Sequence, residues 1–573
     1  MRVAAIAVAL LFQQTAPTFL ESIEVRVTNL DVVVTDRAGK PVTGLRSDDF
    51  TVLENGAPQT ITNFAEFRGT RGVAEAVAST ETSAAPAPVT AEAPPPRKFI
   101  FFIDTMSLTD SNSKQLVKSA TELVRTEMRA GDEAMVVTRT NEVEPFTSDR
   151  DLIVKRLADT LARESRFRAD TAYRQEELFL RSLRASSGDE FKHVARIYAT
   201  RVNRRVTSTL RTLLGLVGSL NQTSGRKVLV VMSESLSSEP GREAFGLMAI
   251  LESLEPTPQA FSGMASGGME SDIFRPAETA AHASWYDVRP MIKELAARAS
   301  ANGVTIYTLQ PDFAGAVAVP GGSADLRAPI GAPTRRGGQD ARGGTFAVTQ
   351  FHRTVVEGTR DTLGTLADDT GGKMFIGARE LPGGFRQIAE DLTSYYSLGY
   401  RSADSGGNIK KIDVRVKNHP DYVVRSRREL LRRTPEREMD EIVAANLIVP
   451  RHVNELGIVA SAGKLERQLP DAWRVPVVVK IPMSKLTFIP DGEKYRGLFT
   501  VHYAIADGAG YTTGTYREQA LEIPAREIDA ARAQFYTFSS TLIVAPGTVR
   551  IAVGVYDRYS HLAGFEQVEV NAR

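Results

Sequence analysis

The chain has 573 residues, which is enough for roughly three or four domains of ordinary size. Hydrophobic residues make up 42% and charged residues 24% of it, close to the averages for soluble globular proteins. This composition excludes a largely disordered chain and a multispan membrane protein. Its 70 Lys and Arg residues balance 69 Asp and Glu residues, which argues against a dedicated nucleic-acid-binding protein. Because cysteine is absent, disulfides, thiolate metal sites and cysteine nucleophiles are excluded.

The first residues have the layout of a secretory signal peptide. Met1 and Arg2 give a positive start, an apolar run follows over residues 3–12, and a short polar stretch ends at Ala16. The apolar run is shorter than the roughly 20 residues of a transmembrane helix. We therefore predict a signal peptide over residues 1–16 and export to the periplasm or the cell exterior, without a transmembrane anchor. The alternative is an N-terminal strand or buried helix.

Two kinds of segment follow the predicted signal peptide. Residues 20–68 alternate apolar and polar side chains between turn signals such as Glu54-Asn55-Gly56, which predicts a small N-terminal β-sandwich. Residues 69–96 are rich in Ala, Thr, Glu and Pro and have few large apolar side chains. Such a composition predicts a linker.

From residue 97 the pattern changes to short apolar strands that alternate with amphipathic helices. Repeated units of this kind predict a doubly wound parallel sheet, a Rossmann-like α/β domain, over residues 97–432. The predicted strands are 99–103, 134–138, 228–232, 304–307 and 374–376. Three insertions interrupt the domain, at 164–205, which is polar and helical in pattern, and at 255–284 and 313–352, which are rich in small residues.

The last part of the chain has a different pattern. The pattern of residues 433–470 predicts a helical connector. Beyond it, residues 471–573 alternate in the manner of antiparallel strands and predict a C-terminal β-sandwich. The chain is therefore expected to be a multidomain protein with an α/β centre and a β-sandwich on each side.

Polar side chains follow two strands of the predicted parallel sheet. Asp104 and several hydroxyls come after strand 99–103, and Ser233 and Glu234 come after strand 228–232. Ligands of doubly wound sheets bind at the carboxyl ends of strands. A carboxylate with hydroxyls at this edge could hold Mg²⁺ or Ca²⁺, because both cations prefer oxygen ligands. The alternative is that the carboxylates accept hydrogen bonds from helix N-termini and loop amides.

The α/β segment resembles a von Willebrand factor type A (VWA) domain. The resemblance is carried by the strand that ends at Asp104 and by the stretches 225–233 and 366–375. Over about residues 20–430 the chain also resembles the bacterial VWFA-related proteins. The marks of that family are residues 32–36, 39–45 and 48–50, the motif Tyr395-Tyr396-Ser397-Leu398-Gly399-Tyr400, and residues 412–416.

The resemblance implies a metal-ion-dependent adhesion site, and this sequence departs from it. Such sites carry D-x-S-x-S after the first strand, a Thr from a second loop and an Asp after the fourth strand. Here Asp104 is kept, while Met106 and Leu108 stand where the two Ser belong. The remaining candidate ligands are a displaced serine, one of two threonines and a glutamate in place of the later Asp, namely Ser107, Thr207 or Thr209, and Glu234. We expect a degenerate site and no required cofactor, with Mg²⁺ or Ca²⁺ as the candidate cations.

The sequence offers no catalytic constellation. It has no G-x-S-x-G elbow, no P-loop and no G-x-G-x-x-G after a strand, and its seven histidines are scattered. An arginine run and a second arginine group are interpreted as solvated faces; they are Arg425, Arg427, Arg428, Arg432 and Arg433, and Arg201, Arg204 and Arg205.

We therefore expect a non-enzymatic protein that binds a protein or cell-surface ligand and no nucleic acid. Two alternatives stay open. One is a metal-dependent hydrolase with its metal at Asp104 and Glu234 and with segments 255–284 and 313–352 as lids. The other is a structural or assembly protein of the cell envelope that binds neighbouring copies through sheet edges.

Overall fold

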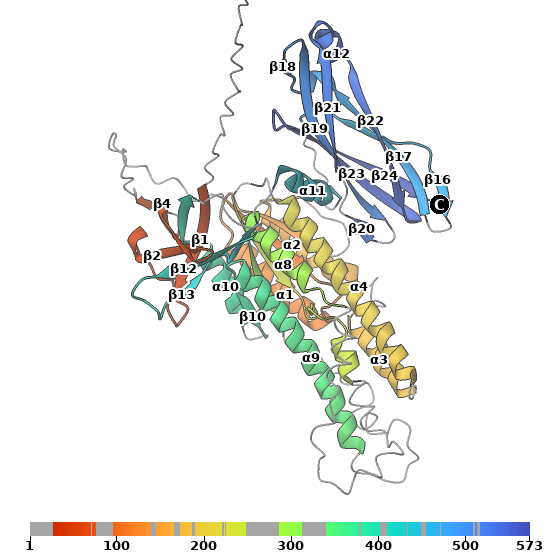
Figure 1. Ribbon diagram of the computed structural model, residues 1–573. Coiled ribbons are helices and arrows are strands. Elements are labelled where there is room, and N and C mark those ends of the chain that lie inside the picture. Colours follow the sequence, from red (N-terminus) through yellow and green to blue (C-terminus); the bar gives the residue numbers. More distant parts are fainter. Residues whose placement is uncertain are drawn as a thin grey trace, which may run out of the picture.

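Figure 1 shows the computed structural model of the chain. It describes residues 27–69, 71–75, 96–138, 145–164, 172–185, 189–220, 223, 225–247, 286–311, 340–377, 380–401, 409–431, 434–447, 454–469, 472–507, 510–512 and 516–572. The predicted signal peptide, the insertion 255–284 and most of the linker lie outside these residues. Among the helices described, none is long and apolar enough to cross a membrane.

The centre of the chain forms a parallel five-stranded sheet, as the sequence predicted. Its order is β10-β9-β8-β6-β7, and every neighbouring pair is parallel. The strands are β6 (Arg97–Ile103), β7 (Glu133–Thr138), β8 (Arg226–Met232), β9 (Val304–Gln310) and β10 (Met374–Ile376). They are nearly continuous apolar runs because helices cover both faces of the sheet.

Helices cover the two faces of this sheet, and each face has its own apolar core. One face packs against α1 (Asp110–Thr126), α2 (Arg150–Glu164) and α10 (Leu381–Asp391). The other packs against α4 (Asp189–Ser219), α8 (Arg289–Ala301) and α9 (Asp340–Asp369). The predicted helical insertion 164–205 supplies α3 (Ala172–Ala185) and the first half of α4, and α9 begins inside the insertion 313–352. Figure 1 shows α3, α4 and α9 extending beyond the sheet.

The N-terminal β region is larger than the sequence predicted. It combines strands that precede the α/β elements in the chain with strands that follow them. Two antiparallel sheets, β13-β1-β11-β4-β5 and β14-β12-β2-β3, share one apolar core. The early strands are β1 (Val27–Thr35), β2 (Phe50–Glu54), β3 (Ala57–Gln59), β4 (Ile61–Arg68) and β5 (Arg71–Glu75). The late strands are β11 (Ser394–Arg401), β12 (Ile409–Val416), β13 (Val423–Arg425) and β14 (Glu429–Leu431).

Two predicted boundaries are therefore wrong. The α/β domain ends near residue 391 and not at 432, because β11 lies between β1 and β4 in the N-terminal sheet. The buried rings of Tyr396 and Tyr400 explain the pairing, since both lie in the core of that sheet pair. The predicted linker 69–96 begins with β5, which continues the sheet beside β4.

Arg425 and Arg427 join the β region to the α/β domain, so the interpretation of these two arginines as part of a solvated face is wrong. Arg425 donates to Asp391 Oδ1 at 2.7 Å, and Tyr307 donates its hydroxyl proton to Asp391 Oδ2 at 2.9 Å. Arg427 donates to the Ser300 carbonyl at 2.8 Å. These contacts link β13 and the segment after it to β9, α8 and α10.

The C-terminal region begins with a helix that packs on the α/β domain. Helix α11 (Pro435–Asn446) contacts α4 on one side and β19 and β23 on the other. Within the described residues of the predicted helical connector 433–470, only this part is helical. Its second half forms β15 (Val459–Ala462) and β16 (Glu466–Leu469), which pair with the first long strand of the next region.

The remaining strands form two antiparallel sheets around a common apolar core. One sheet places β17 (Ala472–Pro482) between β22 (Phe535–Val544) and the pair β15 and β16. The other has β19 (Lys494–Asp507) and β23 (Gly547–Asp557) at its centre. Its outer strands are β18 (Ile489–Asp491), β20 (Gly510–Thr512), β21 (Tyr516–Pro524) and β24 (Ala563–Ala572), and α12 (Ile528–Arg532) joins β21 to β22.

Candidate functional site

The candidate site lies where two neighbouring parallel strands send the chain to opposite faces of the sheet. Strand β6 pairs with β8 along its length, from Arg97 beside Arg226 to Ile103 beside Met232. The chain leaves β6 for α1 on one face and leaves β8 for α8 on the other. This is the topological switch point, where open α/β sheets bind their ligands.

Asp104, the first residue after β6, is held at this point and is almost completely buried. Asp104 as a whole is only 2% exposed. Its backbone N–H donates to the Met232 carbonyl at 3.0 Å, and its Oδ2 accepts a hydrogen bond from Ser233 Oγ at 2.8 Å. Among the described residues its Oδ1 has no hydrogen-bond partner. Asp104 therefore presents one buried carboxylate oxygen that is not neutralised by a donor.

The displaced serine, Ser107, lies beside Asp104 and hydrogen-bonds to the chain on both sides of the switch point. Ser107 Oγ donates to the Asp104 carbonyl at 3.2 Å and accepts from the Glu234 backbone N–H at 3.1 Å. It also lies 3.0 Å from Ser233 Oγ. The sequence analysis did not include Ser233 among the candidate ligands, although its place directly after β8 was the available signal. We name Asp104, Ser107, Ser233 and Glu234 the switch-point cluster.

Glu234 anchors the start of helix α1. Its Oε1 accepts hydrogen bonds from Thr109 N at 3.0 Å, Thr109 Oγ1 at 3.1 Å and Asn112 Nδ2 at 2.7 Å. Burial, together with the nearby charge of Asp104, raises the pKa of Glu234 to about 7 against the effect of these hydrogen bonds. The carboxyl group thus occupies the helix-terminus role that the sequence analysis kept as the alternative to metal binding.

The two candidate threonines lie on α4. Thr207 Oγ1 donates to Asn203 Oδ1 at 3.4 Å, within the same helix. Thr209 is 1% exposed, and its Oγ1 has no hydrogen-bond partner in the described part of the chain. The structure records no hydrogen bond from either hydroxyl to the switch-point cluster.

Arg205, which the sequence analysis placed on a solvated face, is buried beside the loop that follows the cluster. It is 4% exposed and donates to Gln175 Oε1 at 2.6 Å and Ser235 Oγ at 3.0 Å. Arg205 shares a helical face with the buried residues Tyr198 and Val202, at spacings of seven and three residues. That periodicity was the signal by which its burial could have been predicted.

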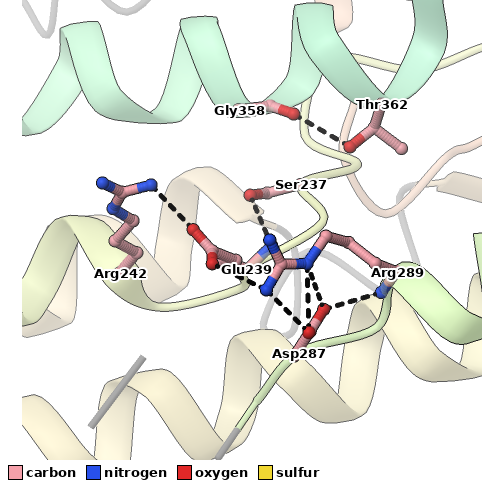
Figure 2. Close-up of polar contacts among 7 residues, drawn as sticks. All are labelled: Ser237, Glu239, Arg242, Asp287, Arg289, Gly358 and Thr362. Atoms are coloured by element: carbon pink, nitrogen blue, oxygen red, sulfur yellow. Dashed lines mark hydrogen bonds and ion pairs between the residues drawn. The ribbon is translucent and has the colours of Figure 1, made fainter. Parts of the chain in front are cut away.

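A network of surface ion pairs fixes the segment that follows the cluster (Figure 2). Arg289, at the start of α8, pairs with Asp287 at 2.8 Å and with Glu239 at 3.4 Å. Helix α9 approaches the same segment so closely that a Cβ on Gly358 would lie 2.7 Å from Ser237 Oγ. The segment after Glu234 is therefore held between α8 and α9.

The oxygen atoms of the switch-point cluster do not provide the ligands that a tightly bound hard cation needs. Mg²⁺ and Ca²⁺ need about six to eight oxygen ligands. Here the two serine hydroxyls, Asp104 Oδ2 and Glu234 Oε1 already exchange hydrogen bonds with one another or with α1, so too few oxygens remain to complete such a shell. The positions of the missing hydroxyls hold Met106 and Leu108, which are buried. In the described ranges no group of three or more His, Asp or Glu side chains could hold a metal ion.

The cluster also lacks the arrangement of an activated nucleophile. A serine nucleophile needs an adjacent general base, and histidine is the usual one. Neither Ser107 nor Ser233 is hydrogen-bonded to a histidine within the described residues. Ser233 Oγ donates a hydrogen bond to the carboxylate of Asp104, which is itself only 2% exposed.

No model of a known protein family and no curated protein matches the chain. Among solved structures, one match is titled "X-ray structure of Northeast Structural Genomics Consortium target SoR45", at 12% identity and a TM-score of 0.16, covering 21% of this chain and 90% of that one. Another is the human COPII-coat protein Sec24c, at 10% identity and a TM-score of 0.18, covering 90% of this chain and 53% of that one. Neither likeness is close enough to inform the fold or the function.

Proposed function

We propose that this chain is an exported, non-enzymatic binding protein whose central α/β domain is a VWA domain with a degenerate adhesion site, flanked by two β-sandwiches. Its ligand is a protein or another cell-surface molecule, bound without a metal ion. The observation that carries the proposal is the switch-point cluster, in which a VWA-like Asp104 is kept while its neighbours hydrogen-bond to each other.

The ligand contacts the rim of the cluster and not the cluster itself. The four side chains of the cluster belong to residues at most 5% exposed, so a macromolecule does not reach them. The exposed or half-buried polar groups beside them include Thr109, Ser111 and Ser235. The buried hydrogen bonds hold the two loops of this rim in place, and a rigid scaffold under exposed loops suits recognition.

A cation titration tests the metal-independent form of the proposal. We expect calorimetry with Mg²⁺, Mn²⁺ and Ca²⁺ to give no saturable heat with the purified protein, because the serine hydroxyls, Asp104 Oδ2 and Glu234 Oε1 are already engaged in hydrogen bonds. The Asp104→Ala variant serves as the matched control. Micromolar binding by the natural sequence that disappears in the variant would overturn metal independence.

The binding function itself is tested by co-sedimentation of labelled protein with the envelope fraction of its own cells. We expect saturable binding that excess chelator leaves unchanged. The substitution Ser111→Arg, on the exposed rim at the start of α1, is expected to weaken binding about tenfold, a loss of about 1.4 kcal/mol. The same substitution at Ser461, in β15, is the control. Equal binding by both variants would show that the ligand binds elsewhere than at this edge of the sheet.

A further inference from the structure

Strand β22 is a long sheet edge without the usual protection against pairing. It pairs with β17 over its whole length, from Phe535 beside Pro482 to Val544 beside Trp473. Within the described part of the chain no strand pairs with its other side. Its sequence, FYTFSSTLIV, contains no charged residue and no proline. An edge of this kind offers a row of backbone donors and acceptors to another strand.

The other long outer strands of the C-terminal region are protected by charge. Strand β21 carries Arg517, Glu518 and Glu522, and β24 carries Glu566 and Glu569. Charged side chains at an edge are a common device against unwanted strand pairing. Figure 1 shows β22 in the same region as these strands. The edge strand β22 therefore lacks the charged side chains that β21 and β24 carry.

The exposed apolar side chains of β22 are placed symmetrically on one face. Phe535 is 58% exposed and Ile543 is 62% exposed, and both are among the most exposed large apolar residues of the described chain. Alternate residues of a strand share a face, so both lie on the same face as Ser539, four positions from each. Ser539 is therefore the midpoint between them.

We propose that β22 pairs antiparallel with β22 of a second copy of this chain, with the two-fold axis at Ser539. In this register Phe535 lies opposite Ile543 of the partner subunit, and the same pair forms again on the other side of the axis. Thr537 lies opposite Thr541 of the partner subunit. Directly opposed residues in an antiparallel pair have side chains on the same face and in contact.

A second copy fits this edge better than an unrelated strand. An isologous interface requires that the same surface be complementary to itself, and the exposed face of β22 has this property because its apolar ends are symmetric about its midpoint. Like charges would oppose each other in a self-pairing charged strand, and β22 has none. The inference is independent of the switch-point cluster and of the ligand bound there.

Single cysteines test both the pairing and its register, because the natural chain contains no cysteine. Two Cβ atoms directly opposed across an antiparallel pair are about 4.5–5.5 Å apart, which a disulfide can span after a small adjustment. We expect the Ser539→Cys variant to form a covalent dimer on mild oxidation. The Thr537→Cys variant should not, because the two cysteines would be roughly 13 Å apart along the strands. A mixture of Thr537→Cys and Thr541→Cys variants should cross-link with each other.

Sedimentation of the full chain without added cysteines gives the complementary measurement. We expect a concentration-dependent doubling of mass for the natural sequence and its loss in the Ser539→Lys variant, which places two lysines opposite each other at the axis. Asn571→Lys, on the exposed part of edge strand β24, is the control and should still dimerise. A monomer at all concentrations together with no cross-link at residue 539 would overturn the proposal, and so would cross-linking of Thr537→Cys alone.

Discussion

The Asp391→Ala substitution is expected to lower the free energy of unfolding by about 3–5 kcal/mol, the usual cost of removing one partner of a buried ion pair. Asp391 is 1% exposed at the end of α10, and its two oxygens accept from Arg425 at 2.7 Å and Tyr307 at 2.9 Å. Alanine would leave the Arg425 guanidinium without its carboxylate in a site where that side chain is only 13% exposed.

The electrostatics of this site support a large effect. Burial acts to lower the pKa of Arg425, but the charge and hydrogen bond of Asp391 outweigh it, so that the pKa is raised. Burial raises the pKa of Tyr307, and the charge of Asp391 raises it further, so Tyr307 stays protonated and donates a hydrogen bond to Asp391. Both neighbours thus depend on the carboxylate, and one of them, Arg425, belongs to the N-terminal β region.

Urea unfolding followed by circular dichroism measures the loss. The matched control is Asp413→Ala, which removes the exposed pair with Arg415, whose side chains are 50% and 69% exposed. Surface pairs of this kind contribute about 0–1 kcal/mol. A further variant, Asp391→Asn, keeps an acceptor for Tyr307 and should lose less than alanine does. Equal losses from Asp391→Ala and Asp413→Ala would show that Asp391 does not join the two regions.

The parallel sheet could be predicted from the sequence because its cause is local. Each of its strands is a short apolar run, and an apolar run bounded by helices is typical of a strand covered on both faces. The N-terminal β region could not be delimited in this way. Strand β11 follows α10 directly in the chain, but its partners, β1 and β4, lie more than 300 residues earlier. Alternation shows that a segment is a strand and not with which strand it pairs.

The same distinction, between local pattern and contacts with distant elements, applies to the candidate site. The positions of Asp104 and Glu234 follow from the strand ends, so the sequence placed both at one edge of the sheet. Which oxygens are occupied depends on partners from other elements, such as Asn112 of α1, and a pattern of residue types does not specify those contacts. Helical periodicity could have predicted the burial of Arg205, but the usual behaviour of charge runs and the near-zero net charge favoured a solvated face.

A second buried carboxyl near this edge predicts how stability changes with pH. Glu243 is 5% exposed, and its Oε1 accepts a hydrogen bond from Tyr198 at 3.1 Å. Burial raises the pKa of Glu243 from 4.5 to about 7, in spite of hydrogen bonds and the charge of Arg205, which act to lower it. Between these two values the folded protein binds more protons than the unfolded chain. The free energy of unfolding therefore falls as the pH rises from about 4.5 to about 7.

The Glu243→Gln variant removes the contribution of Glu243 to this dependence and leaves that of Glu234. The shift corresponds to about 3 kcal/mol, at about 1.4 kcal/mol per pH unit. Glutamine stays neutral, and its carbonyl still accepts from Tyr198. We therefore expect equal stability of the two proteins near pH 4.5 and a gain of up to about 3 kcal/mol for the variant at pH 8, measured by urea unfolding at both pH values. Glu243→Ala, which leaves Tyr198 without its acceptor, should gain less. Parallel pH profiles for the natural protein and Glu243→Gln would mean that Glu243 is ionised in the folded state, with Arg205 holding its charge beside the switch-point cluster.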